Sequence, residues 1–224
     1  MKLKFGAIVV DGSGKIGGHV VSKNRGGKYL RTKVTPTNPN TPAQASARAL
    51  LSSLSTQWAE LTQAERLSFN NAVASFATTD IFGDIKNPSG FNLFVKLNAN
   101  LSGTGQAQIT TAPEKIEVPF SPIENAEGLV AGQTISIAFA DDAMDGTICL
   151  ISATPALSQG VSNASSKFRV IGFAPVVLGG ISVGAMYTDK FGAFVAGQNF
   201  QFKVEPVVAT GQKGTGQTVK AAVV

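Results

Sequence analysis

The stretch from Asp11 to Trp58 constrains the fold more than any other, because it joins three different local patterns. It begins glycine-rich and basic, continues through three prolines within seven residues, and ends in an amphipathic helical pattern. Each proline restricts the residue before it to extended geometry. The sequence therefore predicts an extended ribbon, a stiff connector over residues 35–41 and a helix, in that order.

The residues before the connector predict a small and strongly basic β-ribbon. Residues 7–10 and 19–21 are rich in β-branched side chains, and residues 11–14 between them are turn-forming. Residues 28–34 alternate in the manner of a half-buried strand, after a second turn over residues 24–27. A short hairpin is only marginally stable alone, so we expect it to pair with a neighbouring element or subunit.

The charge of the chain is concentrated in this ribbon. Residues 1–33 hold eight lysines and arginines against one aspartate, whereas the whole chain carries a formal charge of only +5. A basic segment of this kind suits nucleic acid or an acidic protein surface, and a solvated edge strand is the alternative. The residues that we predict to dock a partner are Lys15, Lys23, Arg25, Lys28, Tyr29, Arg31 and Lys33.

Three helices are predicted after the connector. Thr41 and Gln44 form a capping-box pattern, and Thr62 and Glu65 form a second one. Ser89 is the predicted N-cap of the third helix. Because apolar residues recur at steps of three and four in all three segments, the helices are expected to pack as a small bundle.

A change of composition after residue 101 predicts a second domain. Residues 102–113 lack periodicity and are predicted to be a linker. Seven short strand-like runs follow, at residues 116–120, 134–139, 147–152, 168–173, 181–187, 199–205 and 218–223. Their spacing favours an immunoglobulin-like antiparallel β-sandwich. The predicted fold class is α+β, with a docking domain over residues 1–101, the linker and a sandwich over residues 114–224.

No catalytic motif in the sequence is complete. Gly14 and Lys15 resemble a phosphate loop, but the required glycine and hydroxyl residue are replaced by Val9 and Ile16. Residues 180–184 match the G-x-S-x-G pattern of a nucleophile elbow. That motif needs a following helix and a later histidine, whereas the flanks are strand-like and His19 comes far earlier. The sequence therefore predicts a protein that is not an enzyme.

Metal and cofactor sites are not predicted either. A cluster of carboxylates before Gly146 could attract a hard cation, but Ala143 breaks the required alternation, and a hairpin turn explains the pattern. The carboxylates are Asp141, Asp142 and Asp145. Cys149 is expected to be a buried strand residue, and Trp58 a core residue rather than a base-stacking one. Residues 211–216 are expected to form a flexible hairpin loop before the last strand.

The apolar runs are too short for a membrane protein. Residues 5–10 are interrupted by Asp11 and are shorter than the core of a signal peptide. No run approaches the roughly 20 apolar residues of a spanning helix. These observations predict a soluble protein without a membrane partner.

Four segments of the N-terminal half form a recognisable combination. They are GSGKIGGHVVSKNRGGKYLRTKV at residues 12–34, TPTNPNTPAQ at residues 35–44, WAELTQAER at residues 58–66 and GFNLF at residues 90–94. Together they resemble a group of phage and prophage virion structural proteins. The resemblance implies a non-enzymatic virion component located in the particle, with capsid, connector or tail subunits as partners.

Within that resemblance, a capsid-associated auxiliary or decoration protein is the leading expectation. The N-terminal half would dock and the β-sandwich would project. A head–tail connector, tail or fibre-attachment protein is the second possibility. A nucleic-acid-binding protein that uses residues 2–33 is the third.

Overall fold

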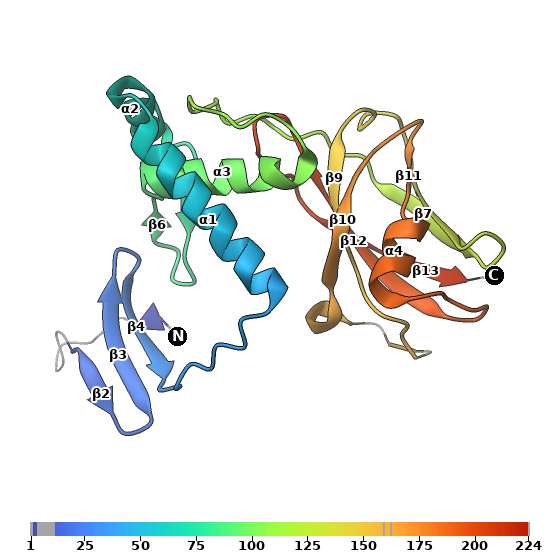
Figure 1. Cartoon of the computed structure of the whole chain (residues 1–224), viewed down its shortest axis with the longest axis horizontal. Helices are drawn as coiled ribbons and strands as arrows, with labels where there is room; N and C mark the ends of the chain where they lie inside the picture. Colours follow the sequence, from blue (N-terminus) through green and yellow to red (C-terminus); the bar gives the residue numbers. More distant parts are fainter. Residues whose placement is uncertain (1, 4–11, 159, 162, 224) are drawn as a thin grey trace.

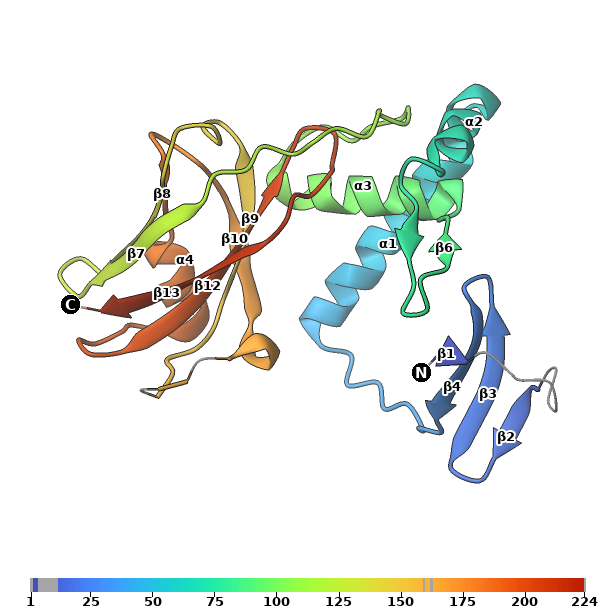
Figure 2. The ribbon, with the colours of Figure 1, turned by 180° about the vertical axis from the view of Figure 1, so that it is seen from behind.

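The computed structural model describes residues 2–3, 12–158, 160–161 and 163–223. It is a mixed α+β structure with three parts that follow one another along the chain: a small N-terminal sheet, a group of helices and a large sheet (Figures 1 and 2). None of the helices in the described ranges has both the length and the apolar character needed to cross a membrane.

The N-terminal sheet has the order β1-β4-β3-β2 and is antiparallel throughout. Its strands are β1 (Lys2–Leu3), β2 (Gly14–Ile16), β3 (His19–Asn24) and β4 (Gly27–Thr32). The turn predicted at residues 11–14 lies partly outside the described residues. Gly14 begins β2, and the chain reverses at residues 17–18, where Gly17 adopts a φ of 53° that suits glycine. The strand predicted over residues 7–10 lies outside the described residues.

Three helices follow the connector, and side-chain caps define where they begin. They are α1 (Pro42–Glu60), α2 (Gln63–Ala72) and α3 (Gly90–Thr104). The capping boxes predicted at Thr41 and Thr62 are both present, and the Ser89 hydroxyl accepts the third cap bond. The apolar faces of the helices meet around Leu54, which is fully buried.

Trp58 is half-buried and packs against the core of these helices. The Trp58 ring packs at 5.9, 5.8 and 5.4 Å from the rings of Phe69, Phe91 and Phe94 respectively. The prediction that this residue belongs to the core is therefore confirmed. A short hairpin that the sequence did not reveal connects α2 to α3, and its strands are β5 (Thr78–Thr79) and β6 (Ile85–Lys86).

The large sheet has seven strands in the order β10-β9-β12-β13-β7-β8-β11. They are β7 (Ile123–Leu129), β8 (Thr134–Phe139), β9 (Ile148–Ala153), β10 (Arg169–Pro175), β11 (Gly180–Ser182), β12 (Asn199–Val207) and β13 (Gln217–Val223). All neighbours are antiparallel except β13 and β7, which are parallel. The predicted mostly antiparallel β-unit is therefore present.

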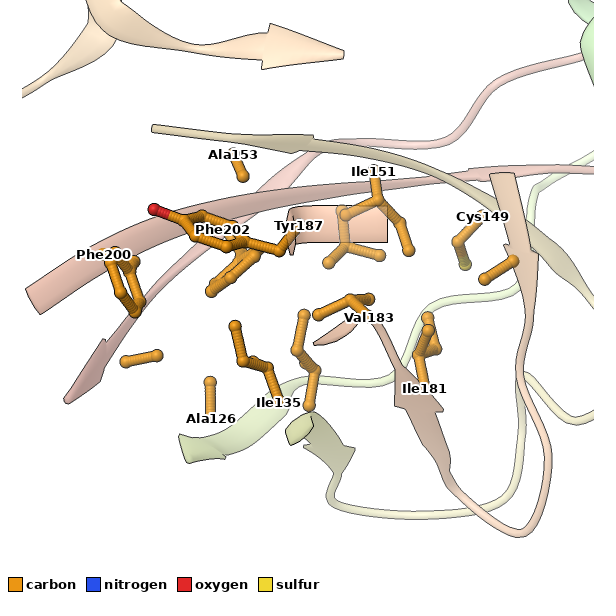
Figure 3. Packing of buried hydrophobic residues seen from close by; sticks show 14 of the residues in the cluster. Ala126, Ile135, Cys149, Ile151, Ala153, Ile181, Val183, Tyr187, Phe200 and Phe202 are labelled. Atoms are coloured by element: carbon orange, nitrogen blue, oxygen red, sulfur yellow. The ribbon is translucent and has the colours of Figure 1, made fainter. Parts of the chain in front are cut away.

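The large sheet folds over on itself and encloses its own core. Figure 3 shows Ile135 of β8 and Ile181 of β11 facing the same interior as Ile151 of β9, although β9 lies far from β8 and β11 in the strand order. The alternation predicted along β8 is present, because its odd-numbered residues are buried. Burial also raises the pKa of the Cys149 thiol to about 12, as expected for a strand cysteine inside this core.

Two predicted strands differ from the structure. Residues 116–120 form no strand, because Pro119 lacks an N–H for a ladder, and the first strand of the sheet is β7 instead. Residues 181–187 were predicted to be one strand. Strand β11 ends at Ser182, and helix α4 (Gly184–Phe191) follows, since Tyr187 and Phe191 then share one face against the core.

The helices are attached to the large sheet through the loop between β12 and β13. The Asn100 amide donates to the Gly211 carbonyl at 2.7 Å, and the buried Gln212 side chain bonds to both Glu114 and Ile116. The hairpin loop predicted before the last strand is present, since β12 and β13 are antiparallel neighbours, and the Asn100 bond holds this loop against α3. Helix α3 itself extends into the residues predicted as a linker and ends at Thr104.

Candidate docking surface

The strands of the N-terminal sheet contain five of the seven predicted docking residues, and the sheet divides them between its two faces. Lys15 and Arg31 both lie opposite Val20, so they share one face, and Tyr29 lies on that face two residues before Arg31. Lys23 pairs directly with Lys28 on the other face.

The remaining two cationic residues lie at the ends of the strands. Arg25 occupies the turn between β3 and β4. Lys33 follows β4, and its N–H donates to the Gly18 carbonyl at 2.8 Å. The structure therefore brings Lys15, Tyr29 and Arg31 together and separates Lys23 and Lys28 from them.

The described side chains of β2, β3 and β4 are mostly exposed or half-buried. Val21 is the one buried side chain among the described residues of β2, β3 and β4, with an exposed fraction of 6%. The Lys23–Lys28 pair adds a cost, since like charges directly opposite each other destabilise a ladder. A sheet with these properties is only marginally stable without a further contact.

The sheet is also loosely attached to the rest of the molecule. Residues 33–41 of the connector are exposed throughout, and Figure 1 shows the chain extended between β4 and α1. A surface pocket of about 380 Å³ lies between the sheet and the helices, and it is lined by Arg25 and Gly26 on one side and by residues 85–89 on the other. The N-terminal sheet therefore lies beside the helices without sharing their core.

Side-chain bonds hold the connector against the start of α1. The Arg48 guanidinium donates to the Asn38 and Asn40 side-chain oxygens at 2.8 and 3.3 Å. Asn40 has a φ of 48°, a left-handed conformation that asparagine tolerates. Arg48 thus sets the direction in which the N-terminal sheet leaves the helices, a role that sequence patterns alone did not assign.

The β5–β6 hairpin is a second exposed feature of the N-terminal half, and it was not predicted from the sequence. The β5–β6 hairpin exposes Ile81 by 74%, Phe82 by 44% and Ile85 by 73%. Apolar side chains this exposed on an ordered hairpin are typical of interaction sites. A short hairpin of this kind leaves a weak signal in sequence, because two-residue strands are too short to show alternation.

The G-x-S-x-G segment has part of the expected context of a nucleophile elbow. A helix does follow the strand, contrary to the prediction, and Ser182 is exposed at the end of β11. His19, however, lies in β3 of the N-terminal sheet. Gly184 has a packing role, because a Cβ there would collide with the Gln133 carbonyl. The described residues thus bring no histidine to this serine.

The carboxylates at residues 141–145 serve as backbone caps. Asp145 accepts a hydrogen bond from the Gly179 N–H at 2.8 Å, and Asp141 accepts one from the Ala143 N–H at 3.0 Å. The predicted hairpin turn is wrong, since β8 and β9 are not neighbours in the sheet and this loop crosses between them. Within the described ranges, no group of three potential ligands lies close enough together to hold a metal.

Comparisons with known proteins give only distant likenesses. No family model matches the chain, and no curated protein matches it. Among solved structures, a β-1,2-glucanase from Parabacteroides distasonis is 14% identical with a TM-score of 0.31, over 49% of this chain and 13% of that one. An Fn3-like protein from Clostridium thermocellum is 9% identical with a TM-score of 0.30, over 48% of this chain and 96% of that one.

Proposed function

We propose that this chain is a non-enzymatic structural component of a virus particle, most simply a capsid-associated auxiliary or decoration protein. Its N-terminal half docks onto other virion subunits. Its C-terminal β-unit, which we propose to be an immunoglobulin-like sandwich, projects from the assembled surface. The partners are capsid subunits, and the protein is present in many copies.

The observation that carries this proposal is the N-terminal sheet, in which Val21 is the one buried side chain among the described residues of β2, β3 and β4. Such a sheet gains stability when a partner covers a face or adds a strand to an edge. Strand β2 lies at one edge and, among the described strands, pairs only with β3. Docking would therefore add a neighbour to the edge that β2 forms among the described strands.

Charge and sequence resemblance support the same proposal. The cationic residues on both faces of the sheet favour an acidic partner surface, which would also relieve the Lys23–Lys28 repulsion. The motifs at residues 12–44, 58–66 and 90–94 resemble phage virion proteins. Since residues 33–41 are exposed, the sheet can lie across a neighbouring subunit while the helices remain beside it.

Cryo-electron microscopy of particles that contain the protein tests the proposal. We expect many copies at regular lattice positions, with residues 15–34 paired to another subunit. A single ring at one vertex would instead place the protein at the connector or tail. Absence from the particles would refute both structural roles.

A matched pair of variants tests the docking surface itself. Lys23→Glu reverses a charge on the N-terminal sheet, whereas Lys190→Glu reverses an exposed charge on α4 of the β-unit. Each variant competes with the unaltered protein for binding to particles that lack it. The bound fraction of Lys23→Glu should be lower than that of the unaltered protein, whereas the bound fraction of Lys190→Glu should be equal to it. Equal binding of the two variants would contradict docking through the N-terminal sheet.

Nucleic-acid binding is a second candidate because of one arrangement. Lys15, Tyr29 and Arg31 share a face, which combines cations with an aromatic ring that could stack on a base. For binding of this type, the logarithm of the binding constant should fall linearly with the logarithm of the salt concentration. Titration of single-stranded DNA at several salt concentrations measures that slope, and a flat response would exclude this role.

A further inference from the structure

Three neighbouring surface pockets share lining residues and form one groove between the N-terminal sheet and the β-unit. The first is the pocket beside Arg25, and the second and third have volumes of about 240 and 210 Å³. Lys86 lines the first and second pockets, and Lys96 lines the second and third. Figures 1 and 2 both show the β3–β4 turn, β6, α3 and the β12–β13 loop in succession along this path. We call the three pockets together the connecting groove.

Cations line the connecting groove in all three pockets. The described residues of its lining include five lysines and arginines and no aspartate or glutamate. The five are Arg25, Lys86, Lys96, Lys115 and Lys213. Composition does not explain this, because residues 1–33 hold eight of the 19 lysines and arginines but only one of the 14 carboxylates, so that carboxylates outnumber cations in the remainder. The groove therefore concentrates positive charge in a part of the chain that is otherwise acidic.

Three of the five cations have no ionic partner among the described residues. They are Arg25, Lys96 and Lys115, and all three are exposed. The other two are already paired, since the Lys213 ammonium lies 3.2 Å from the Glu205 carboxylate and the Lys86 ammonium lies 4.0 Å from that of Asp80. A bound carboxylate would supply the missing counter-charge, so the groove favours an anionic partner over a neutral one.

The second and third pockets also present apolar side chains. Phe76 lines both of them, with Leu93 in the second and with Ile116 and Val118 in the third. Ile116 is 44% exposed, so part of this apolar surface meets solvent in the free protein. Both pockets are smaller than the roughly 300–1,000 Å³ of small-molecule sites. They therefore suit single apolar side chains of a longer partner rather than a cofactor.

A polypeptide fits this lining better than single-stranded nucleic acid does. Sites for single strands rely on aromatic rings on which the bases stack. Phe76 is the one aromatic residue among the described residues of the groove, and with an exposed fraction of 9% it offers no such platform. Asn87 and Asn92, which are both exposed, add amide groups that can form hydrogen bonds with a peptide backbone.

We propose that the connecting groove binds an acidic, extended polypeptide segment of a partner protein. Carboxylates of the segment lie against Lys96 and Lys115, and its apolar side chains enter the pockets beside Phe76 and Ile116. The extended form follows from the path of the groove, which runs over several elements instead of forming one deep cavity. Because the groove lies outside the strands of the N-terminal sheet, this inference goes beyond the proposed docking role and does not depend on it.

Fluorescence anisotropy with the full-length chain tests the chemistry of the partner. The probe is a short fluorescent peptide that contains glutamate, leucine and glycine in equal numbers. One control peptide has glutamine in place of glutamate, and the other has serine in place of leucine. Both controls should bind about fivefold more weakly, because the first lacks the carboxylates and the second lacks the apolar side chains. Equal binding of the probe and either control would overturn the proposal.

A matched pair of double variants tests where the probe binds. Lys96→Gln with Lys115→Gln removes two unpaired charges from the groove, whereas Lys167→Gln with Lys190→Gln removes two exposed charges from the β-unit. The first variant should bind the probe about fivefold more weakly with an unchanged Tm, and the second should bind like the unaltered protein. Equal affinities of the two variants would place the probe elsewhere, the N-terminal sheet included, and refute the assignment. Tighter binding of an oligothymidylate of equal charge would refute it as well and assign the groove to nucleic acid.

Discussion

Replacing Val21 with alanine should unfold the N-terminal sheet locally and leave the rest of the protein intact. The substitution removes two methyl groups from a buried side chain, a loss of about 1.5 kcal/mol of hydrophobic stabilisation. Strands β2, β3 and β4 contain 3, 6 and 6 residues, and ordering each residue costs about 1–2 kcal/mol. Because Val21 is the one buried side chain in the described part of these three strands, the sheet has little excess stability to lose.

Val204 provides a matched control, because it is a buried valine of the large sheet. Val204→Ala removes the same two methyl groups from a continuous core. It should lower the free energy of unfolding of the β-unit by about 1.5 kcal/mol or more. For a chain of this length, that change corresponds to a fall in Tm of about 3–6 °C.

Hydrogen exchange measured by mass spectrometry, together with thermal unfolding, separates the two outcomes. Val21→Ala should accelerate exchange in residues 14–32 without changing Tm, whereas Val204→Ala should lower Tm. In the unaltered protein, residues 14–32 should already exchange faster than α3 and β12. An equal fall in Tm for both variants would show that the N-terminal sheet unfolds together with the core, and the argument for docking would fail.

Three further predictions concern the rest of the chain. Gln212→Ala leaves two backbone groups without partners and should lower the free energy of unfolding by about 1–3 kcal/mol in urea titrations, with no such loss for the exposed Lys190→Ala. Because burial raises the pKa of Cys149 to about 12, its thiol should react with a disulfide reagent only after unfolding. The Thr62 hydroxyl and N–H hold the pKa of Glu65 below its usual value, so the cap stabilises the protein above the ordinary pKa and is lost on acidification. Glu65→Gln should therefore reduce the acid dependence of thermal stability below about pH 5, and an unchanged dependence would refute this role.

The helical part of the fold could be predicted closely from sequence because its signals are local. A helix begins where a side chain within three residues satisfies its free N–H groups, so Thr41, Thr62 and Ser89 identify the three starts. Strands with strict alternation of apolar and polar residues, such as β8, could be predicted equally well. Helix α4 was missed because its eight residues follow a β-branched run and contain no side-chain cap.

The docking surface was predictable only as a set of residues. Charge density in the sequence identified the basic ribbon, but the cross-strand register decides that Lys15 and Arg31 share a face while Lys23 and Lys28 lie on the other. That register depends on where the turns fall, and the turn between β2 and β3 falls at residues 17–18.

Sequence alone thus determined the order of the ribbon, helices and strands, because capping, periodicity and proline geometry act within a few residues. Only the tertiary structure decided which distant segments meet. It brought Gln212 to Glu114 and enclosed one core with strands from both ends of the large sheet. Such contacts depend on how whole elements pack, and no local pattern in the sequence encodes that packing.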